Sequence, residues 1–183
     1  MPTLTIIVFH TTVQGSARSM HMIPIPWRQV ESWTCIACGR CCKGYDVSLR
    51  FEEWVSLVRN YGAGFTEPRI DRLCLRKKQD GTCIFLYSFL DRWLCGLQEM
   101  KPRACQLWPF KIYDKPKYGG PHEASYNSWD KKFFIYADPL CMGLRWGEPT
   151  QEFTQKVLPE FVEIALGLRE KQHYSTSYIP YRL

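Results

Sequence analysis

The chain has 183 residues, a net charge of +6 and nine cysteines. Its hydrophobic content of 45% and aromatic content of 15% exclude a disordered chain and predict a folded domain with a core. No apolar run approaches the roughly 20 residues of a membrane span, and no basic segment precedes the longest one, as it would in a signal peptide. We therefore expect a cytoplasmic protein without a membrane span. In that reducing compartment, abundant cysteines favour metal or redox chemistry over disulfides.

Residues 1–34 contain no cysteine and are predicted to form an N-terminal arm. Within it, residues 3–9 are typical of a short strand, whereas Pro24 and Pro26 would interrupt a helix. Met20 and Met22 are alternative starting residues, in which case part of this arm is not translated.

Residues 35–147 are predicted to form the main domain. Its first helix would follow Ser48 as N-cap and end at Gly62, since apolar residues recur there with helical spacing. Residues 70–78 and 82–87 predict a hairpin around the turn Asp80-Gly81. We further expect a short strand over 93–97, a helical turn or two within 99–107, a loop over 113–128 and a strand over 132–137.

Residues 148–183 are predicted to form a long helix and a tail that pack on the main domain. Thr150 is a suitable N-cap, and an apolar face continues to about Lys171. Pro159 should disturb this helix because it has no backbone N–H to donate. The elements together predict an α+β fold: a small, irregular, metal-organised domain with short strands, an early helix and a long C-terminal helix.

The densest chemical signal is the run C-I-A-C-G-R-C-C from Cys35 to Cys42. Two cysteines with C-x2-C spacing can present both thiolates to one metal, and Gly39 eases the turn between them. Neighbouring side chains in an extended chain point to opposite faces. Cys41 and Cys42 therefore suggest two adjacent metal sites that share this segment, with one of the two joining Cys35 and Cys38 and the other facing a second metal.

Four cysteine segments, in this order, resemble the YkgJ-type cysteine-cluster family, whose members are described as zinc- or iron-chelating domains. They are C-I-A-C-G-R-C-C, D-G-T-C-I-F-L, C-G-L-Q-E-M-K-P-R-A-C-Q-L-W-P-F and C-M-G-L-R-W-G. The departures lie at Leu97-Gln98, Lys101 and Gln106, where the family usually has Ile-Tyr, Arg and Arg. The resemblance implies eight metal ligands, which are Cys35, Cys38, Cys41, Cys42, Cys83, Cys95, Cys105 and Cys141. Cys74 lies outside the pattern and is predicted to be a free thiol.

Metal identity follows only partly from the ligands, because thiolates suit both zinc and iron–sulfur clusters. Structural zinc favours paired C-x2-C knuckles, and only the first half of this set has that form. A ligand set spread over residues 35–141 instead favours one or two [4Fe–4S] clusters, with zinc as the alternative.

The expected function is that of an iron–sulfur protein for electron transfer, or one that assists a partner enzyme that the sequence does not identify. Some members of the family are described as iron–sulfur oxidoreductases, and a flagellin lysine methylase carries a similar cluster. We identify no catalytic side chain. The alternative is a zinc-stabilised protein- or RNA-binding module without redox activity.

Nucleic-acid binding is the weaker prediction for the basic residues. One group lies within residues 69–78, and another is interleaved with aromatics within residues 111–132. Solvated loops explain both groups more simply. The histidines, at positions 10, 21, 122 and 173, do not have metal-ligand spacing to one another or to a cysteine.

Overall fold

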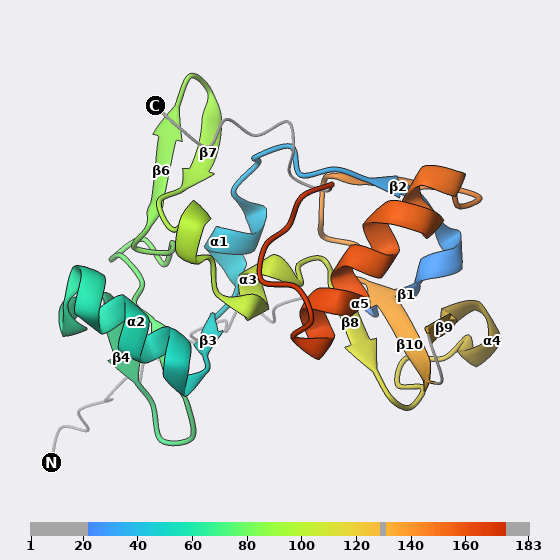
Figure 1. Ribbon diagram of the computed structural model, residues 1–183. Helices are drawn as coiled ribbons and strands as arrows, with labels where there is room; N and C mark the ends of the chain where they lie inside the picture. Colours follow the sequence, from blue (N-terminus) through green and yellow to red (C-terminus); the bar gives the residue numbers. More distant parts are fainter. Residues whose placement is uncertain (1–21, 129–130, 175–183) are drawn as a thin grey trace, which may run out of the picture.

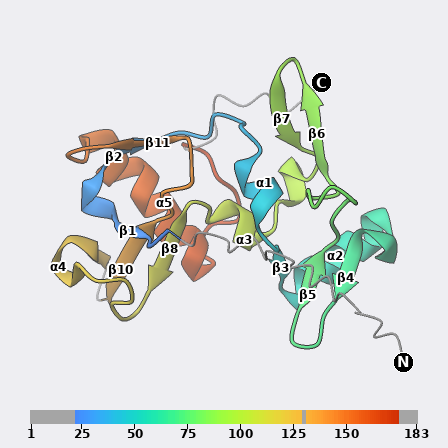
Figure 2. The ribbon, with the colours of Figure 1, turned by 180° about the vertical axis from the view of Figure 1, so that it is seen from behind.

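A computed structural model describes residues 22–128 and 131–174. Short strands and helices form two lobes, seen on the two sides of Figure 1 and again from behind in Figure 2. One lobe is built around α5 (Leu158–Leu166) and the sheet that contains β10 (Lys131–Ala137). The other is built around α2 (Phe51–Tyr61) and the strands β3 (Ser48–Leu49), β4 (Thr66–Pro68) and β5 (Leu73–Leu75). Helices α1 (Arg40–Gly44) and α3 (Arg103–Gln106) lie between the lobes. This mixture of elements confirms the predicted α+β class.

The first lobe contains a four-stranded antiparallel sheet around β10 (Lys131–Ala137), as predicted for residues 132–137. Its partners are β1 (Ile25–Pro26), β8 (Phe110–Tyr113) and β9 (Ser125–Ser128). A separate pair joins β2 (Val30–Trp33) to β11 (Leu144–Trp146). Strands β1 and β2 both fall in the range predicted as an N-terminal arm, whose division from the main domain stays a prediction.

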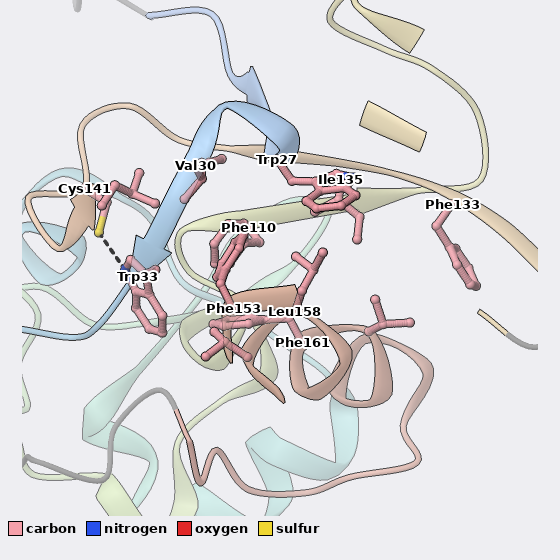
Figure 3. Packing of buried hydrophobic residues seen from close by; sticks show 14 residues of the cluster. Trp27, Val30, Trp33, Phe110, Phe133, Ile135, Cys141, Phe153, Leu158 and Phe161 are labelled. Atoms are coloured by element: carbon pink, nitrogen blue, oxygen red, sulfur yellow. Dashed lines mark hydrogen bonds between the residues drawn. The ribbon is translucent and has the colours of Figure 1, made fainter. Parts of the chain in front are cut away.

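The core of this lobe is aromatic and lies between β2, β8, β10 and the C-terminal helix (Figure 3). Phe161 is fully buried there, and its ring meets those of Trp33 and Phe110 with centroids 5.1 and 4.7 Å apart. Edge-to-face packing of this kind adds to the stabilisation that burial alone supplies. The core therefore fixes β2, which leads into the first cysteine segment, and β8, which follows the segment that contains Cys105.

The C-terminal helix is shorter than predicted. A π-helical turn (Phe153–Val157) precedes α5 (Leu158–Leu166), which carries Pro159 in its first turn. A π turn beside a proline is expected, since proline cannot donate to the usual carbonyl. The helix ends at Gly167 in a left-handed conformation (φ 77°), so the prediction that it reaches Lys171 was wrong.

The second lobe contains α2 (Phe51–Tyr61) and a three-stranded sheet in the order β3 (Ser48–Leu49), β5 (Leu73–Leu75), β4 (Thr66–Pro68). The helix was predicted, but Ser48 is not its N-cap. Arg50 occupies that position, and its backbone N–H donates to Glu53 Oε2 at 2.9 Å. The short 3₁₀ turn Ala63–Phe65 links α2 to β4.

The hairpin predicted around Asp80-Gly81 forms only as a short antiparallel contact, in which the Lys78 and Ile84 backbone N–H groups donate to the Thr82 and Arg76 carbonyls. Only an isolated bridge between Lys77 and Cys83 spans it, because β5 pairs with β3 and β4 instead. A longer hairpin lies further along, between β6 (Leu86–Phe89) and β7 (Arg92–Cys95).

Other expectations have mixed outcomes. The predicted helical turns within 99–107 are a 3₁₀ turn (Gln98–Met100) and α3. Residues 113–128 were predicted as a loop, yet they include α4 (Pro121–Ala124) and β9. The strand predicted over 3–9 lies outside the described residues. A 3₁₀ turn (Trp27–Gln29) joins β1 to β2.

Candidate metal centre

A cavity of about 250 Å³ lies where the two lobes meet. It is far larger than a single water-sized ion needs, because a water occupies about 30 Å³ in the liquid. All eight cysteines of the family pattern line it: Cys35, Cys38, Cys41, Cys42, Cys83, Cys95, Cys105 and Cys141. Cys74 does not; it is 1% exposed in β5. The fold thus brings together residues that are far apart in the sequence.

The first four cysteines lie on a turn that leads into one turn of helix. Ala37 and Gly39 both have left-handed backbone conformations, with φ of 54° and 69°. The chain then enters α1, where the Cys42 backbone N–H donates to the Gly39 carbonyl at 3.0 Å. The premise that Cys41 and Cys42 are extended was wrong, because both lie in this helix. Their Sγ atoms are 3.8 Å apart.

Cys83 and Cys95 come together at the base of the β6–β7 hairpin. Cys95 pairs with Leu86 in the strand register, and the Leu86 backbone N–H donates to the Cys83 carbonyl at 3.0 Å. The Cys83 N–H in turn donates to the Cys42 carbonyl at 2.8 Å. Backbone hydrogen bonds therefore connect the hairpin directly to α1.

Two further segments of the chain contribute Cys105 and Cys141. Cys105 lies in α3, which begins after Pro102. Cys141 follows β10, and the Trp33 indole Nε1–H donates to its Sγ at 3.2 Å (Figure 3). Its backbone N–H donates to the Asp138 carbonyl at 3.1 Å. The aromatic core of the first lobe thus reaches the cavity through Trp33.

A recurring local contact favours the thiolate form of four of these cysteines. Burial raises the pKa of Cys35, Cys83, Cys95 and Cys141. In each case the backbone N–H two residues along the chain acts in the opposite direction and lowers the pKa. For Cys95 this donor is Leu97, 3.4 Å from the sulfur. Hydrogen bonds to sulfur are among the means by which proteins tune bound metal centres.

Cys41 differs from its neighbour in acidity. The hydrogen bond between the two thiols lowers the pKa of Cys41, whereas the same contact and burial raise that of Cys42. When one of the two is deprotonated, the other can donate to it, which favours a first thiolate, and metal binding requires deprotonated sulfur. Among the described residues, no three Cys, His, Asp or Glu side chains converge as a ready single-ion site. The assignment of ligands consequently remains a proposal.

The basic groups considered for nucleic-acid binding are mostly engaged within the chain. Arg69 and Lys77 both pair with Asp46, at 2.6 and 2.8 Å. In the second group, Lys111 pairs with Asp138 at 3.3 Å, and Lys117 lies 4.8 Å from the ring centre of Tyr113. These contacts reduce the free charge that a phosphate backbone would meet. Trp129, His10 and His21 lie outside the described residues.

Sequence comparison adds one finding. The model of a protein family described as "Putative zinc- or iron-chelating domain", with the signature CxxCxxCC, matches residues 34–142. This range includes all eight cysteines that line the cavity. No curated protein and no solved structure matches the chain. Within the described residues, no helix is both long and apolar enough to cross a membrane.

Proposed function

The chain belongs to this family of zinc- or iron-chelating cysteine domains, and from that premise we propose that it is a cytoplasmic iron–sulfur protein for electron transfer. The convergence of eight cysteines on one cavity is the observation that carries the proposal. When bound, an iron–sulfur cluster supplies a one-electron carrier whose potential depends on hydrogen bonds and solvent exposure. Alternatively, the same iron–sulfur protein would assist a partner enzyme.

The residues present suit such a group. The cysteines would bind it as thiolates, which are soft sulfur ligands that both iron–sulfur clusters and zinc prefer. Trp33, Trp93 and Trp108 also line the cavity and limit the access of water. Backbone N–H groups beside the sulfurs offset the negative charge that metal–thiolate centres carry.

The surroundings of the cysteines suggest two centres. Cys42, Cys83, Cys95 and Cys105 pack against the hydrophobic cluster of the second lobe, which includes Leu57 and Leu97. Cys35 and Cys141 pack against the aromatic cluster of the first lobe. Because Cys42 packs on the second lobe, we assign Cys41, together with Cys38, to the centre that contains Cys35 and Cys141, which gives each centre four thiolates. Cys41 and Cys42 then lie at the boundary, one on each centre.

One distance favours the alternative of zinc. Four sulfurs at about 2.3 Å from a tetrahedral Zn²⁺ ion lie roughly 3.8 Å from one another. The Sγ atoms of Cys41 and Cys42 are 3.8 Å apart, so these two neighbours could also share one zinc ion. In that case the protein would be a zinc-stabilised module that binds a protein or RNA.

Anaerobic purification followed by metal and sulfide analysis tests the proposal. We expect a brown protein that absorbs near 400 nm and contains iron and acid-labile sulfide. Substitution of Cys95 or Cys141 by Ser should each remove about half of the iron, because each would affect a different centre. Cys74→Ser is the matched control, since Cys74 is buried outside the cavity, and it should retain the full content.

The outcomes separate the alternatives. A colourless protein with stoichiometric zinc would replace the iron–sulfur assignment by the zinc module. If Cys95→Ser and Cys141→Ser each removed all of the metal while the variants stayed folded by circular dichroism, a single shared centre would replace two. Metal-free wild-type protein after anaerobic reconstitution would exclude both forms.

A further inference from the structure

A lysine side chain lines the cysteine cavity. Lys101 lies between the 3₁₀ turn Gln98–Met100 and α3, four residues before Cys105. Its Nζ donates a hydrogen bond to Gln172 Oε1 at 3.1 Å. No carboxylate forms an ion pair with it in the part of the chain that the structure describes. The ammonium group therefore has a neutral partner and no counter-ion from an acidic side chain.

Lys101 is half-buried, and a charge taken partly out of water is costly unless an opposite charge compensates it. The groups that surround Lys101 with the opposite sign are sulfurs: Cys35, Cys95, Cys105 and Cys41 all favour its charged form. The relation is mutual, because Lys101 lowers the pKa of the Cys105 thiol against the strong effect of burial. A Cys₄ centre with Zn²⁺ or a [4Fe–4S]²⁺ core carries two net negative charges and would complete this balance.

A second lysine at the cavity provides a contrast. Lys111 also lines it, but its Nζ lies 3.3 Å from Asp138 Oδ2. Asp138 is 4% exposed and additionally accepts a hydrogen bond from the Tyr45 hydroxyl at 3.3 Å. The charge of Lys111 is thus balanced within the protein. Of these two lysines, Lys101 is the one whose charge is not paired with a carboxylate of the described residues and can interact with the sulfurs.

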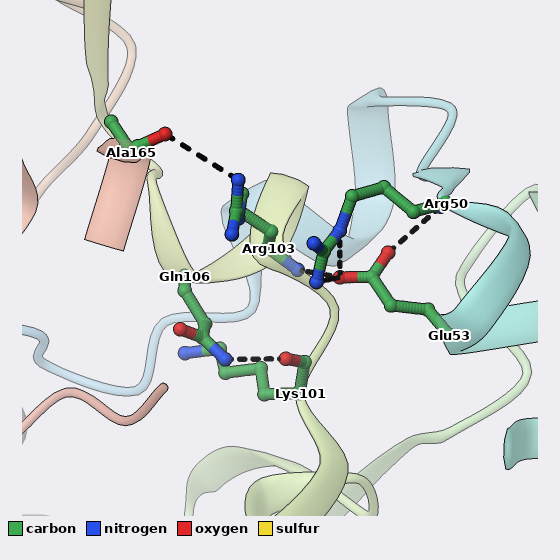
Figure 4. Close-up of polar contacts among 6 residues, drawn as sticks. All are labelled: Arg50, Glu53, Lys101, Arg103, Gln106 and Ala165. Carbon is green, nitrogen blue, oxygen red and sulfur yellow. Dashed lines mark hydrogen bonds and ion pairs between the residues drawn. The ribbon is translucent and has the colours of Figure 1, made fainter. Parts of the chain in front are cut away.

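The chain after α5 holds Lys101 in place. Gln172 accepts from Lys101 and donates through Nε2 to the Gln106 carbonyl at 2.7 Å. Gln106 Nε2 donates to the Lys101 carbonyl at 2.6 Å, and Arg103 reaches the Ala165 carbonyl, as Figure 4 shows. These bonds connect the segment that carries Lys101 and Cys105 to the C-terminal chain.

The C-terminal chain is itself anchored to α5. Glu160, which is 1% exposed, accepts hydrogen bonds from the backbone N–H groups of His173 and Tyr174 at 2.9 and 2.7 Å. The chain therefore turns back beside α3, as both ribbon views show. Because the buried Glu160 carboxylate binds these two backbone groups, it also fixes the position of Gln172, which directly precedes His173.

We propose that Lys101 is the cation that compensates the metal–thiolate centres of the cavity, and that residues 165–174 position its ammonium group beside the sulfurs. The inference rests on the proposed function, because it requires a bound metal centre. Lys101 would then influence the metal centre through its charge, although it is not a ligand. A positive charge there favours centres of higher negative charge, which for an iron–sulfur cluster means the reduced form.

Four variants test this role. Lys101→Met removes the charge and keeps an unbranched chain, Lys101→Arg keeps the charge, and Gln172→Ala releases the ammonium from its anchor. Lys115→Met is the matched control, since Lys115 is exposed, does not line the cavity and lies outside residues 165–174. For iron-loaded protein the measurement is a redox titration of the cluster. For zinc-loaded protein it is competition with a Zn²⁺ chelator.

We expect Lys101→Met to lower the equilibrium constant for reduction at least tenfold, which is about 59 mV for one electron. For zinc, the affinity should fall at least tenfold. Lys101→Arg and Lys115→Met should stay within threefold of wild type, and Gln172→Ala should change in the direction of Lys101→Met by at least threefold.

The inference fails if metal-loaded Lys101→Met stays within threefold of wild type. It also fails if Lys101→Arg loses as much as Lys101→Met, because shape rather than charge would then matter. An unchanged Gln172→Ala would overturn the positioning by residues 165–174. A wild-type protein that binds neither iron nor zinc overturns the proposed function and this inference with it.

Discussion

Replacement of Gly39 by Ala should destabilise the cysteine segment strongly. Gly39 has a φ of 69°, and this left-handed conformation costs about 1–2 kcal/mol for a residue with a Cβ atom. The new Cβ would also lie 2.7 Å from Trp93 Cβ and 2.9 Å from Trp93 Cγ. Such overpacking typically costs about 1–3 kcal/mol. We therefore expect a loss of about 2–5 kcal/mol in the free energy of unfolding.

The displacement should also reach the metal centre. Trp93 lies in β7 two residues before Cys95, and its backbone N–H donates to the Ala37 carbonyl at 2.8 Å. A shift of Trp93 would move the hairpin relative to the first cysteine segment. We expect the metal content to fall together with stability.

Urea unfolding followed by circular dichroism measures the first effect, and metal analysis the second. Gly44→Ala is the matched control in the same helix, because its Cβ would meet no atom within 4 Å. It should be neutral or stabilise the protein by up to about 1 kcal/mol. A Gly39→Ala variant within about 0.5 kcal/mol of wild type, with full metal content, would refute the reasoning.

Three further substitutions test other parts of the structure. Gly143→Ala would place a Cβ against the Thr34 carbonyl oxygen, so urea unfolding should show a loss of about 3 kcal/mol or more; an unchanged midpoint would contradict this close approach. Phe161→Ala should cost about 3–5 kcal/mol in the same assay, because the ring is fully buried, and a loss below 1 kcal/mol would show that the core collapses around it. Asp46→Asn should cost on the order of 1 kcal/mol at pH 7, since the hydrogen bond from Lys77 lowers the pKa of this partly exposed carboxyl. That stabilisation is present above the unfolded-state pKa near 3.8 and is lost as pH falls through the lower folded-state pKa, so the stabilities of the two proteins should converge in acid; a pH-independent difference would contradict this origin.

The sequence was informative where local pattern and tertiary environment agree. Helix α2 and strand β10 were predicted because apolar spacing and strand-forming residues match the side that each buries. The cysteine spacing and the resemblance identified eight residues that share one cavity. It was the order of the motifs, rather than any local geometry, that singled out these eight and left Cys74 aside.

Pairing between distant segments could not be predicted in the same way. The turn at Asp80-Gly81 forms as expected, with Asp80 Oδ1 accepting from the Thr82 N–H at 2.9 Å, yet the flanking strands have other partners. Likewise, β2 pairs with β11 across more than a hundred residues. A turn signal fixes the local direction of the chain, whereas register depends on which surfaces are buried together.

The same limit explains why Lys101 was interpreted only as a departure from the family pattern. Its significance depends on Gln172, which lies 71 positions away and reaches it only because α5 ends at Gly167. A helix continuing to Lys171, as the apolar spacing predicted, would have carried Gln172 along the helix axis instead. The left-handed glycine that shortens the helix therefore also allows the C-terminal chain to turn back to the cysteine cavity. The proposed charge balance between Lys101 and the metal centre therefore depends on where α5 ends.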